Sequence, residues 1–198
     1  MKLILASNNQ KKLKEMRAIL SEMGIEVLSQ REAGLELEVE ENGTTFAENA
    51  MLKAKGACDA LNIPAVADDS GLQVEALDGA PGIYSARYAG EGASDKELYE
   101  LLIKNMKGKE NRKARFVSSI ACVFPNGDTV TAEGYCYGEI LDAPRGENGF
   151  GYDPVFYMPE EGGTMAEISP ERKNLTSHRA HALQEFKVKL EEYLKTQK

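Results

Sequence analysis

The chain has 198 residues, with 24 lysines and arginines against 32 aspartates and glutamates, which gives a formal net charge of −8 at pH 7. Hydrophobic residues make up 42% of the chain and charged residues 28%, proportions that are typical of a globular protein and argue against disorder. An acidic chain of this kind lacks the broad basic face that nucleic acids and anionic membranes attract. We therefore predict a single domain over residues 1–198 that meets any anionic ligand through local groups.

The apolar segments predict neither a membrane span nor a secretory signal. No run of about 18 apolar residues is present, and only four consecutive apolar residues, 3–6, precede the first polar segment. The cysteines Cys58, Cys122 and Cys136 match neither a zinc site nor a disulfide framework, which favours buried reduced thiols. These features predict a cytoplasmic protein.

The N-terminal third alternates between strand and helix patterns. Residues 3–6 are predicted to form a strand, followed by a helix with apolar residues at helical spacing and a second strand over residues 25–28. Residues 32–43 are dense in glutamate and are predicted to be a loop or an exposed edge, and a candidate cation site. Thr45 and Glu48 fit a capping box, which predicts a helix from there to about residue 61.

The rest of the chain continues the same alternation. Residues 65–67 form a short apolar strand, and a second capping box, Ser94 to Glu97, begins another helix. An Asn-Gly turn predicts a hairpin of residues 116–124 and 129–137, and residues 142–154 are predicted to be an irregular loop before a final helix from Ser177. The pattern predicts an α/β fold with a mixed β-sheet and flanking helices.

The polar segment after the first strand is a candidate phosphate site. Free amides and the positive end of the following helix favour an anion there, and hydroxyl, amide and ammonium side chains add donors. The common glycine-rich nucleotide fingerprints are absent, and an ordinary polar turn is the alternative. The segment consists of Ser7, Asn8, Asn9, Gln10, Lys11 and Lys12.

Two adjacent carboxylates, Asp68 and Asp69, follow the third predicted strand. Such a pair repels unless it is solvated, hydrogen-bonded or neutralised by a cation. Mg²⁺ would neutralise it, because this ion takes carboxylates together with phosphate oxygens and water, and Glu40 or Glu41 could contribute. The alternative is a capped turn, in which acidic and serine side chains bond nearby amides.

The glycine-rich loop carries two aromatic residues beside a carboxylate. Phe150, Gly151, Tyr152 and Asp153 could stack on a base and recognise its edge, whereas the alternative for both rings is a minor core cluster beneath the loop.

Cationic donors are expected near the start of the last helix. They are Lys173, His178 and Arg179, and a helix cap at Ser177 is the alternative use of this segment. Phosphate donors, metal carboxylates, an aromatic platform and cationic side chains together indicate a nucleotide as the ligand.

Six blocks of sequence carry a family resemblance. They are Ser7-Asn8-x-x-x-Lys12, Glu40-Glu41-x-Gly43-x-Thr45-Phe46-x-Glu48-Asn49-Ala50, Asp68-Asp69-Ser70-Gly71-Leu72, Gly79-x-Pro81-Gly82-x-Tyr84-Ser85-Ala86-Arg87-Tyr88, Phe150-Gly151-Tyr152-Asp153-Pro154 and Ser177-His178-Arg179. In this order they resemble the inosine triphosphate pyrophosphatase family, and the likeness covers nearly the whole chain.

The resemblance implies a Mg²⁺-dependent enzyme that hydrolyses non-standard purine nucleoside triphosphates, such as ITP, dITP and XTP, to the monophosphate and pyrophosphate. It also implies an elongated central sheet with two lobes around an active-site cleft, and a homodimer. One departure is Lys11, where many bacterial members have glycine, so the first turn is expected to differ in shape or to add a phosphate contact.

The resemblance also implies a role for each matching residue. Ser7, Asn8 and Lys12 would hold the triphosphate, Glu40 and Asp69 would bind Mg²⁺, Asp69 would be the general base, and Ser70 would contact the substrate. Phe150, Tyr152, Asp153, Lys173, His178 and Arg179 would form the base pocket.

The base is predicted to be selected by whether it accepts or donates a hydrogen bond at its 6-position. A 6-keto purine accepts at the position where adenine donates, and Lys173, protonated His178 and Arg179 only donate, which explains rejection of ATP but not of GTP. Two other classes stay open: a nucleotide sensor without turnover, and an interaction protein whose motifs are only turns and caps.

Overall fold

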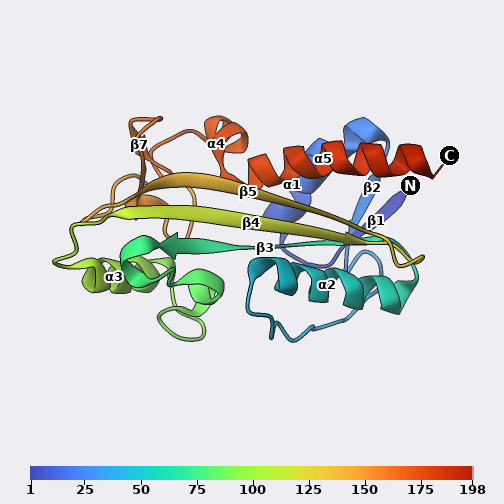
Figure 1. Ribbon diagram of the computed structural model, residues 1–198, viewed down its shortest axis with the longest axis horizontal. Helices are drawn as coiled ribbons and strands as arrows, with labels where there is room; N and C mark the ends of the chain where they lie inside the picture. Colours follow the sequence, from blue (N-terminus) through green and yellow to red (C-terminus); the bar gives the residue numbers. More distant parts are fainter. Residues whose placement is uncertain (198) are drawn as a thin grey trace. The chain divides into compact units, whose positions relative to one another are not determined.

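The computed structural model describes residues 1–197, which form a mixed β-sheet with flanking helices (Figure 1). Within this range, seven strands lie in the order β2-β1-β3-β4-β5-β6-β7. The strands are β1 (Lys2–Leu5), β2 (Glu26–Ser29), β3 (Ala65–Val74), β4 (Lys113–Val123), β5 (Thr129–Ile140), β6 (Phe156–Met158) and β7 (Gly163–Thr164). The helices are α1 (Gln10–Leu20), α2 (Phe46–Leu61), α3 (Asp95–Met106), α4 (Pro170–Thr176) and α5 (His178–Thr196). The predicted α/β fold is confirmed.

The chain divides into two compact units. The first unit consists of Met1–Asp69, Ser118–Gly134 and His181–Lys198, and the second of Ser70–Val117 and Tyr135–Ala180. The boundaries fall inside β3, β4, β5 and α5, so these four elements contribute to both units.

The first unit contains the predicted β-α-β arrangement. β1 pairs in parallel with β2 and with β3. Alternate residues of β1 enter different cores, because Leu3 and Leu5 pack with α1 and α5, whereas Ile4 packs with α2. Figure 1 accordingly shows α5 and α2 on opposite faces of this part of the sheet.

β3 is longer than predicted. It runs to Val74, so the segment Asp68 to Gly71 lies within a strand rather than in a turn after it, and the capped-turn alternative is wrong. Leu72 and Val74 are fully buried in the core of the second unit, which gives the chain an apolar reason to stay extended beyond the acidic pair.

The helix boundaries follow the predicted caps, with one difference. Ser94 and Glu97 form a complete capping box at α3. At α2 the Thr45 hydroxyl accepts from the Glu48 amide, but the Glu48 carboxylate accepts from the amide and hydroxyl of Thr44 instead of from Thr45. The capping box at α2 is therefore incomplete: the hydroxyl of the cap residue bonds as predicted, but the glutamate bonds the residue before the cap.

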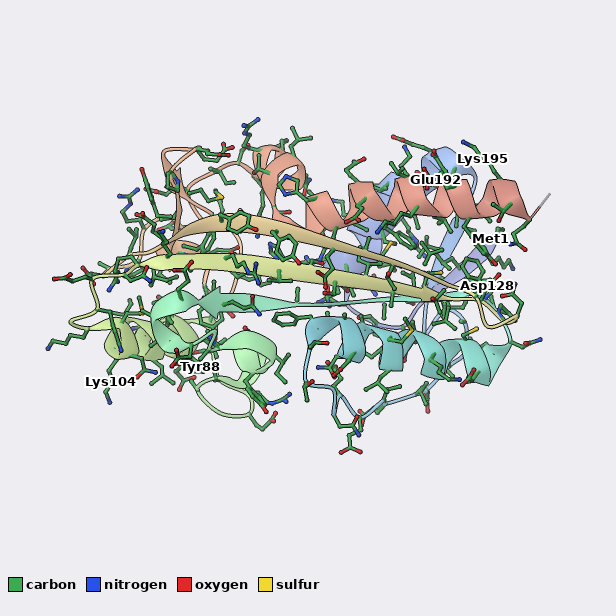
Figure 2. The ribbon with its side chains drawn as sticks, in the orientation of Figure 1. Met1, Tyr88, Lys104, Asp128, Glu192 and Lys195 are labelled. Carbon is green, nitrogen blue, oxygen red and sulfur yellow. The ribbon has the colours of Figure 1, made fainter. Side chains whose placement is uncertain are left out.

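The hairpin and the final helix are also present. The Phe124 amide donates to the Asp128 carbonyl at 2.9 Å across the β4–β5 turn, and the Tyr193 hydroxyl of α5 donates to the Asp128 carboxylate at 3.0 Å. Figure 2 shows Asp128 and Glu192 at the same end of the first unit. α5 begins at His178, where the Ser177 hydroxyl accepts from the Ala180 amide as the predicted cap.

The second unit has a core of its own. Leu98, Leu102 and Met106 of α3 pack with residues of β3, β4, β5 and β6, including Phe116 and Phe156. All three cysteines are free and buried, as predicted, and burial raises the pKa of Cys136 to about 12. None of the helices described over residues 1–197 combines the length and the apolar character that crossing a membrane requires.

Candidate active site

In the first unit, the adjacent carboxylates of β3 lie on opposite faces of the sheet. Asp68 contacts Lys12 of α1, with 2.9 Å between Oδ1 and Nζ, and Asp69 contacts Lys53 of α2, with 3.2 Å between the same atoms. Successive side chains of a strand alternate between its two faces, so each carboxylate meets a lysine from a different helix. The expected mutual repulsion is thus relieved by separation and by two ammonium groups.

Lys53 makes three polar contacts in this part of the unit and was not predicted. Its Nζ donates to the Asp69 carboxylate and to the Asp68 carbonyl at 3.0 Å, and it lies 3.4 Å from the Glu41 carboxylate. The residue stands on the face of α2 that buries Ala50, Ala54 and Ala57. A lysine at helical spacing within an alanine stripe is the signal that could have identified it. We call Lys12, Glu41, Lys53, Asp68 and Asp69 the carboxylate–lysine cluster.

The glutamate-rich segment is irregular, as predicted, but α2 holds it in place. The Asn49 side chain accepts a hydrogen bond from the Gly43 amide at 2.9 Å. A Cβ at residue 43 would lie 2.6 Å from the Asn49 Oδ1 atom and 2.7 Å from the Glu48 Cβ atom, so this close approach requires glycine. The contact brings Glu41 to Lys53, while Glu40 is exposed on the same segment.

Burial raises the pKa of Asp69, an effect that Lys53 opposes and the charge of Glu41 increases. Two carboxylates therefore share one ammonium group at this position. Among the side chains described over residues 1–197, no group of three or more metal-ligating residues is gathered. Mg²⁺ commonly takes only one or two carboxylates, with phosphate oxygens and water completing its shell, so the donor pair of Asp69 and Glu41 fits this ion. The role of Glu40 as a ligand stays a prediction.

The first turn is largely occupied by its own hydrogen bonds. Asn9 caps α1, because its side-chain oxygen accepts from the amides of Lys11 and Lys12 at 3.0 and 3.2 Å. Ser7 accepts from the Asn9 amide, and Asn8 accepts from the Arg31 amide. Gln10 begins α1, and its side-chain amide donates to the Asn8 carbonyl. The polar-turn alternative is therefore correct for Asn9, and the amides that it caps are not open donors for phosphate.

In the second unit, Phe150, Asp153 and Lys173 form a second polar group, which we call the loop cluster. Lys173 Nζ lies 2.6 Å from Asp153 Oδ2 and 4.7 Å from the centre of the Phe150 ring. The same Asp153 oxygen accepts from the Phe150 amide at 3.1 Å. Burial raises the pKa of Asp153 and Lys173 opposes the rise. Phe150 is 45% exposed, so its ring can still receive a planar ligand.

Tyr152 corrects the prediction of a two-ring platform. Its ring is only 4% exposed and packs in the core of the second unit, and its hydroxyl donates to the Ser85 carbonyl at 2.6 Å. The core-cluster alternative is correct for Tyr152, whereas Phe150 remains at the surface. Gly151, between them, has a φ of 59°, a left-handed value that glycine adopts without strain.

The remaining predicted residues lie at the start of α5 and in β3. The His178 ring stacks on Phe116 of β4, with centres 4.8 Å apart and planes inclined by 16°. Arg179 reaches the Ser70 hydroxyl at 3.5 Å. Phe116 follows the ordinary pattern of a buried strand residue, and no sequence signal distinguished it. His178 and Ser70 are therefore each placed by a neighbour within the second unit.

Comparison with known sequences identifies the family of the chain. Residues 3–189 match the model of the Ham1 family. The dITP/XTP pyrophosphatase of Desulfotalea psychrophila is 48% identical over 193 residues, which cover 98% of this chain and 86% of that protein. The dITP/XTP pyrophosphatase of Bacillus subtilis is 46% identical over 190 residues, which cover 95% of this chain and 96% of that protein.

Solved structures give the same result. The Staphylococcus aureus Ham1 protein has a TM-score of 0.91 and 43% identity, with complete coverage of both chains. A HAM1 protein from Coxiella burnetii has a TM-score of 0.93 and 41% identity, covering 97% of this chain and 99% of that one. The predicted family resemblance is confirmed, and the chain belongs to the Ham1 family.

Proposed function

We propose that this protein is a Mg²⁺-dependent enzyme that hydrolyses ITP, dITP and XTP to the monophosphate and pyrophosphate, and so removes non-standard purines from the nucleotide pool. The relatives named dITP/XTP pyrophosphatase support a nucleoside triphosphate hydrolase acting on such purines. The observation that carries the proposal is the half-buried Asp69, which shares the Lys53 ammonium group with Glu41. We further propose that the enzyme is a cytoplasmic homodimer.

The carboxylate–lysine cluster would receive the triphosphate end of the substrate. Lys12 of α1 pairs with Asp68 of β3, and its ammonium group would neutralise charge that develops on the leaving pyrophosphate. Ser7, Asn8 and Lys11 would add donors around the phosphates. Because Asn9 already caps two amides of the first turn, side chains rather than free backbone amides would supply most of the binding there.

Asp69, together with Glu41 or Glu40, would hold Mg²⁺, which supplies charge neutralisation for the phosphate oxygens when it is bound. Asp69 would also orient a water molecule toward the α-phosphorus and accept its proton as the new P–O bond forms and pyrophosphate leaves. Lys53 would keep the Asp69 carboxylate in place during this step, since its Nζ bonds both that carboxylate and the preceding carbonyl. Most of the rate enhancement would come from positioning and electrostatics.

The residues of the second unit would recognise the base. Phe150 offers an exposed ring for stacking, and Lys173, His178 and Arg179 can donate to the oxygen of a 6-keto purine. Adenine presents a donor at that position and would leave these groups unpaired, which costs affinity and favours ITP and XTP over ATP. Ser70, held by Arg179, is a further candidate contact.

The decisive measurement is product release from ITP, XTP, GTP and ATP, each with Mg²⁺ and with EDTA. We expect Mg²⁺-dependent pyrophosphate from ITP and XTP, with little from ATP or GTP. Orthophosphate as the product would instead place the attack on the γ-phosphorus. Tight binding of ITP without any product would indicate a nucleotide sensor instead of an enzyme. Activity that survives EDTA would contradict the role of Mg²⁺.

A further inference from the structure

A buried hydrogen-bonded chain links three segments of the second unit. The Tyr152 hydroxyl donates to the Ser85 carbonyl at 2.6 Å, and the Ser85 hydroxyl accepts from the Leu72 amide at 2.9 Å. Ser85 also donates to the Gly82 carbonyl at 2.6 Å, which closes its own short helical turn over Gly82–Arg87. Tyr152, Ser85 and Leu72 are all buried. The chain thus connects the glycine-rich loop to β3, two residues after Ser70.

Tyr152 stands between the two residues of the loop that carry the chemistry. Phe150 precedes it by two positions and Asp153 follows it directly. Gly149 and Gly151, on either side of Phe150, have positive φ values of 77° and 59°. Because glycine has more backbone freedom than any other residue, the backbone of this segment does not by itself fix the position of Phe150. Two side chains therefore restrain this part of the loop: the Asp153 carboxylate, which accepts from the Phe150 amide, and the Tyr152 side chain, which ties the loop to Ser85.

We propose that Tyr152 and Ser85 are positioning residues, which hold the loop bearing Phe150 and Asp153 in the conformation that receives the purine base. The inference rests on the proposed function and deepens it, because it assigns the preformed state of the base site to two buried hydroxyl groups that bond the protein backbone. Burial raises the pKa of the Tyr152 hydroxyl, which favours the protonated form that donates to the Ser85 carbonyl.

The expected kinetic signature follows from the fraction of molecules in which the loop is ordered. When only a fraction of the protein has the binding-competent conformation, the apparent dissociation constant rises by the inverse of that fraction. Chemistry at the α-phosphorus is unchanged once substrate is bound. Loss of the restraint should therefore raise KM for ITP and leave kcat nearly constant.

The test is the variant Tyr152→Phe, which removes one oxygen atom and keeps the buried ring. We expect KM for ITP to rise about tenfold, since a buried carbonyl loses its donor, with kcat within about twofold of the wild type. Ser85→Ala should raise KM in the same direction. The double variant should show less than the product of the two single effects, because both remove parts of one chain of hydrogen bonds.

Two control variants separate positioning from a general loss of stability. Tyr88→Phe removes a tyrosine hydroxyl of the same unit whose partner is the exposed Asn105 side chain, and KM should not change. Leu102→Ala creates a cavity in α3 within the same core and should lower Tm without raising KM at temperatures well below it. If Leu102→Ala raises KM as much as Tyr152→Phe does, or if Tyr152→Phe lowers only Tm, the positioning role is wrong.

A second readout does not depend on activity. Backbone hydrogen exchange over residues 148–155 should be faster in Tyr152→Phe than in the wild type, and Tyr88→Phe should match the wild type. Unchanged exchange in Tyr152→Phe would overturn the inference even if the wild-type protein is an active pyrophosphatase. Faster exchange in a protein that releases no pyrophosphate from ITP would instead retain the restraint and reject the proposed function.

Discussion

The two candidate clusters hold their charged groups in different ways. In the carboxylate–lysine cluster, three ion pairs join β3 or its neighbouring acidic segment to a lysine on a long helix, α1 or α2. In the loop cluster, a buried carboxylate and an exposed ring lie on an irregular loop, and the lysine belongs to the short helix α4. The first cluster takes its geometry from regular secondary structure, whereas the second takes it from side-chain hydrogen bonds.

This difference matches the tasks proposed for the two clusters. Phosphoryl transfer depends on charges held within a fraction of an ångström, and such precision is easiest on strands and helices. A base site needs an exposed ring and correctly placed donors, which a loop can supply if buried groups such as Tyr152 restrain it. The first cluster should therefore govern turnover and the second should govern affinity and selectivity.

The largest effect is expected from removing the Asp69 charge. Asp69→Asn should reduce kcat on ITP by at least about 10³-fold, because the variant loses both a proton acceptor and a metal carboxylate. Asp68→Asn is the matched control, since Asp68 lies on the opposite face of β3 against Lys12, and its loss of turnover should be smaller. If steady-state assays of pyrophosphate release show the same loss of kcat for both variants, the two faces of β3 do not have different roles in turnover.

Lys53 tests whether a helix positions the catalytic carboxylate. Lys53→Met keeps the length of the side chain and removes the donor, and we expect kcat to fall about 10²-fold with a smaller change in KM. Lys55→Met is the control, because Lys55 is exposed on the same helix and pairs with Asp59. If Lys53→Met keeps the wild-type kcat, Lys53 does not position Asp69 for catalysis and only neutralises the charge around it.

Much of the fold was predictable because its signals are local. The caps at Thr45, Ser94 and Ser177 and the Asn-Gly turn gave the helix starts and the hairpin correctly. The continuation of β3 through Asp68 and Asp69 was not predictable from local preference, since it depends on tertiary packing of Leu72 and Val74. The strands β6 and β7, of three and two residues, were too short to show a pattern.

The sequence supplied candidate residues for the site but not their arrangement. Motifs identified Asp69, Phe150 and Asp153, yet they could not show that Tyr152 is a core residue or that Asn9 is a helix cap. Lys53 was missed because its partners Asp68 and Asp69 lie 15 and 16 residues away, on a different element, and the cap of α2 says only where the helix begins. Long-range contacts decide such roles, and a single sequence does not record which residues meet.

Among the smaller effects is loss of the exposed ring of the loop cluster. Phe150→Ala should raise KM for ITP about tenfold, since stacking of a base on an aromatic ring contributes about 1–3 kcal/mol, while kcat stays near the wild-type value. Tyr137→Ala removes another exposed ring of the second unit, 66% exposed, and should leave both constants unchanged. A fall in kcat without a change in KM for the Phe150 variant would contradict the division of tasks between the clusters.

The smallest effect concerns the charge of Asp153 and depends on pH. Because burial raises the pKa of this carboxyl in the folded protein, its contribution to stability is fully present below the unfolded value, about 3.9, and is lost as pH rises through the folded value. The Tm of Asp153→Asn minus that of the wild type should therefore increase with pH across this window, by about 2–4 °C for each kcal/mol. Glu161→Gln should behave oppositely, since the hydrogen bond from Arg172 lowers the pKa of Glu161 and its contribution is present above about 4.3 and lost as pH falls. Calorimetric scans of the three proteins from pH 3 to 8 would check this. A Tm difference for Asp153→Asn that does not change with pH would show that Asp153 titrates as an ordinary surface carboxyl, which would remove the buried charge from the loop cluster.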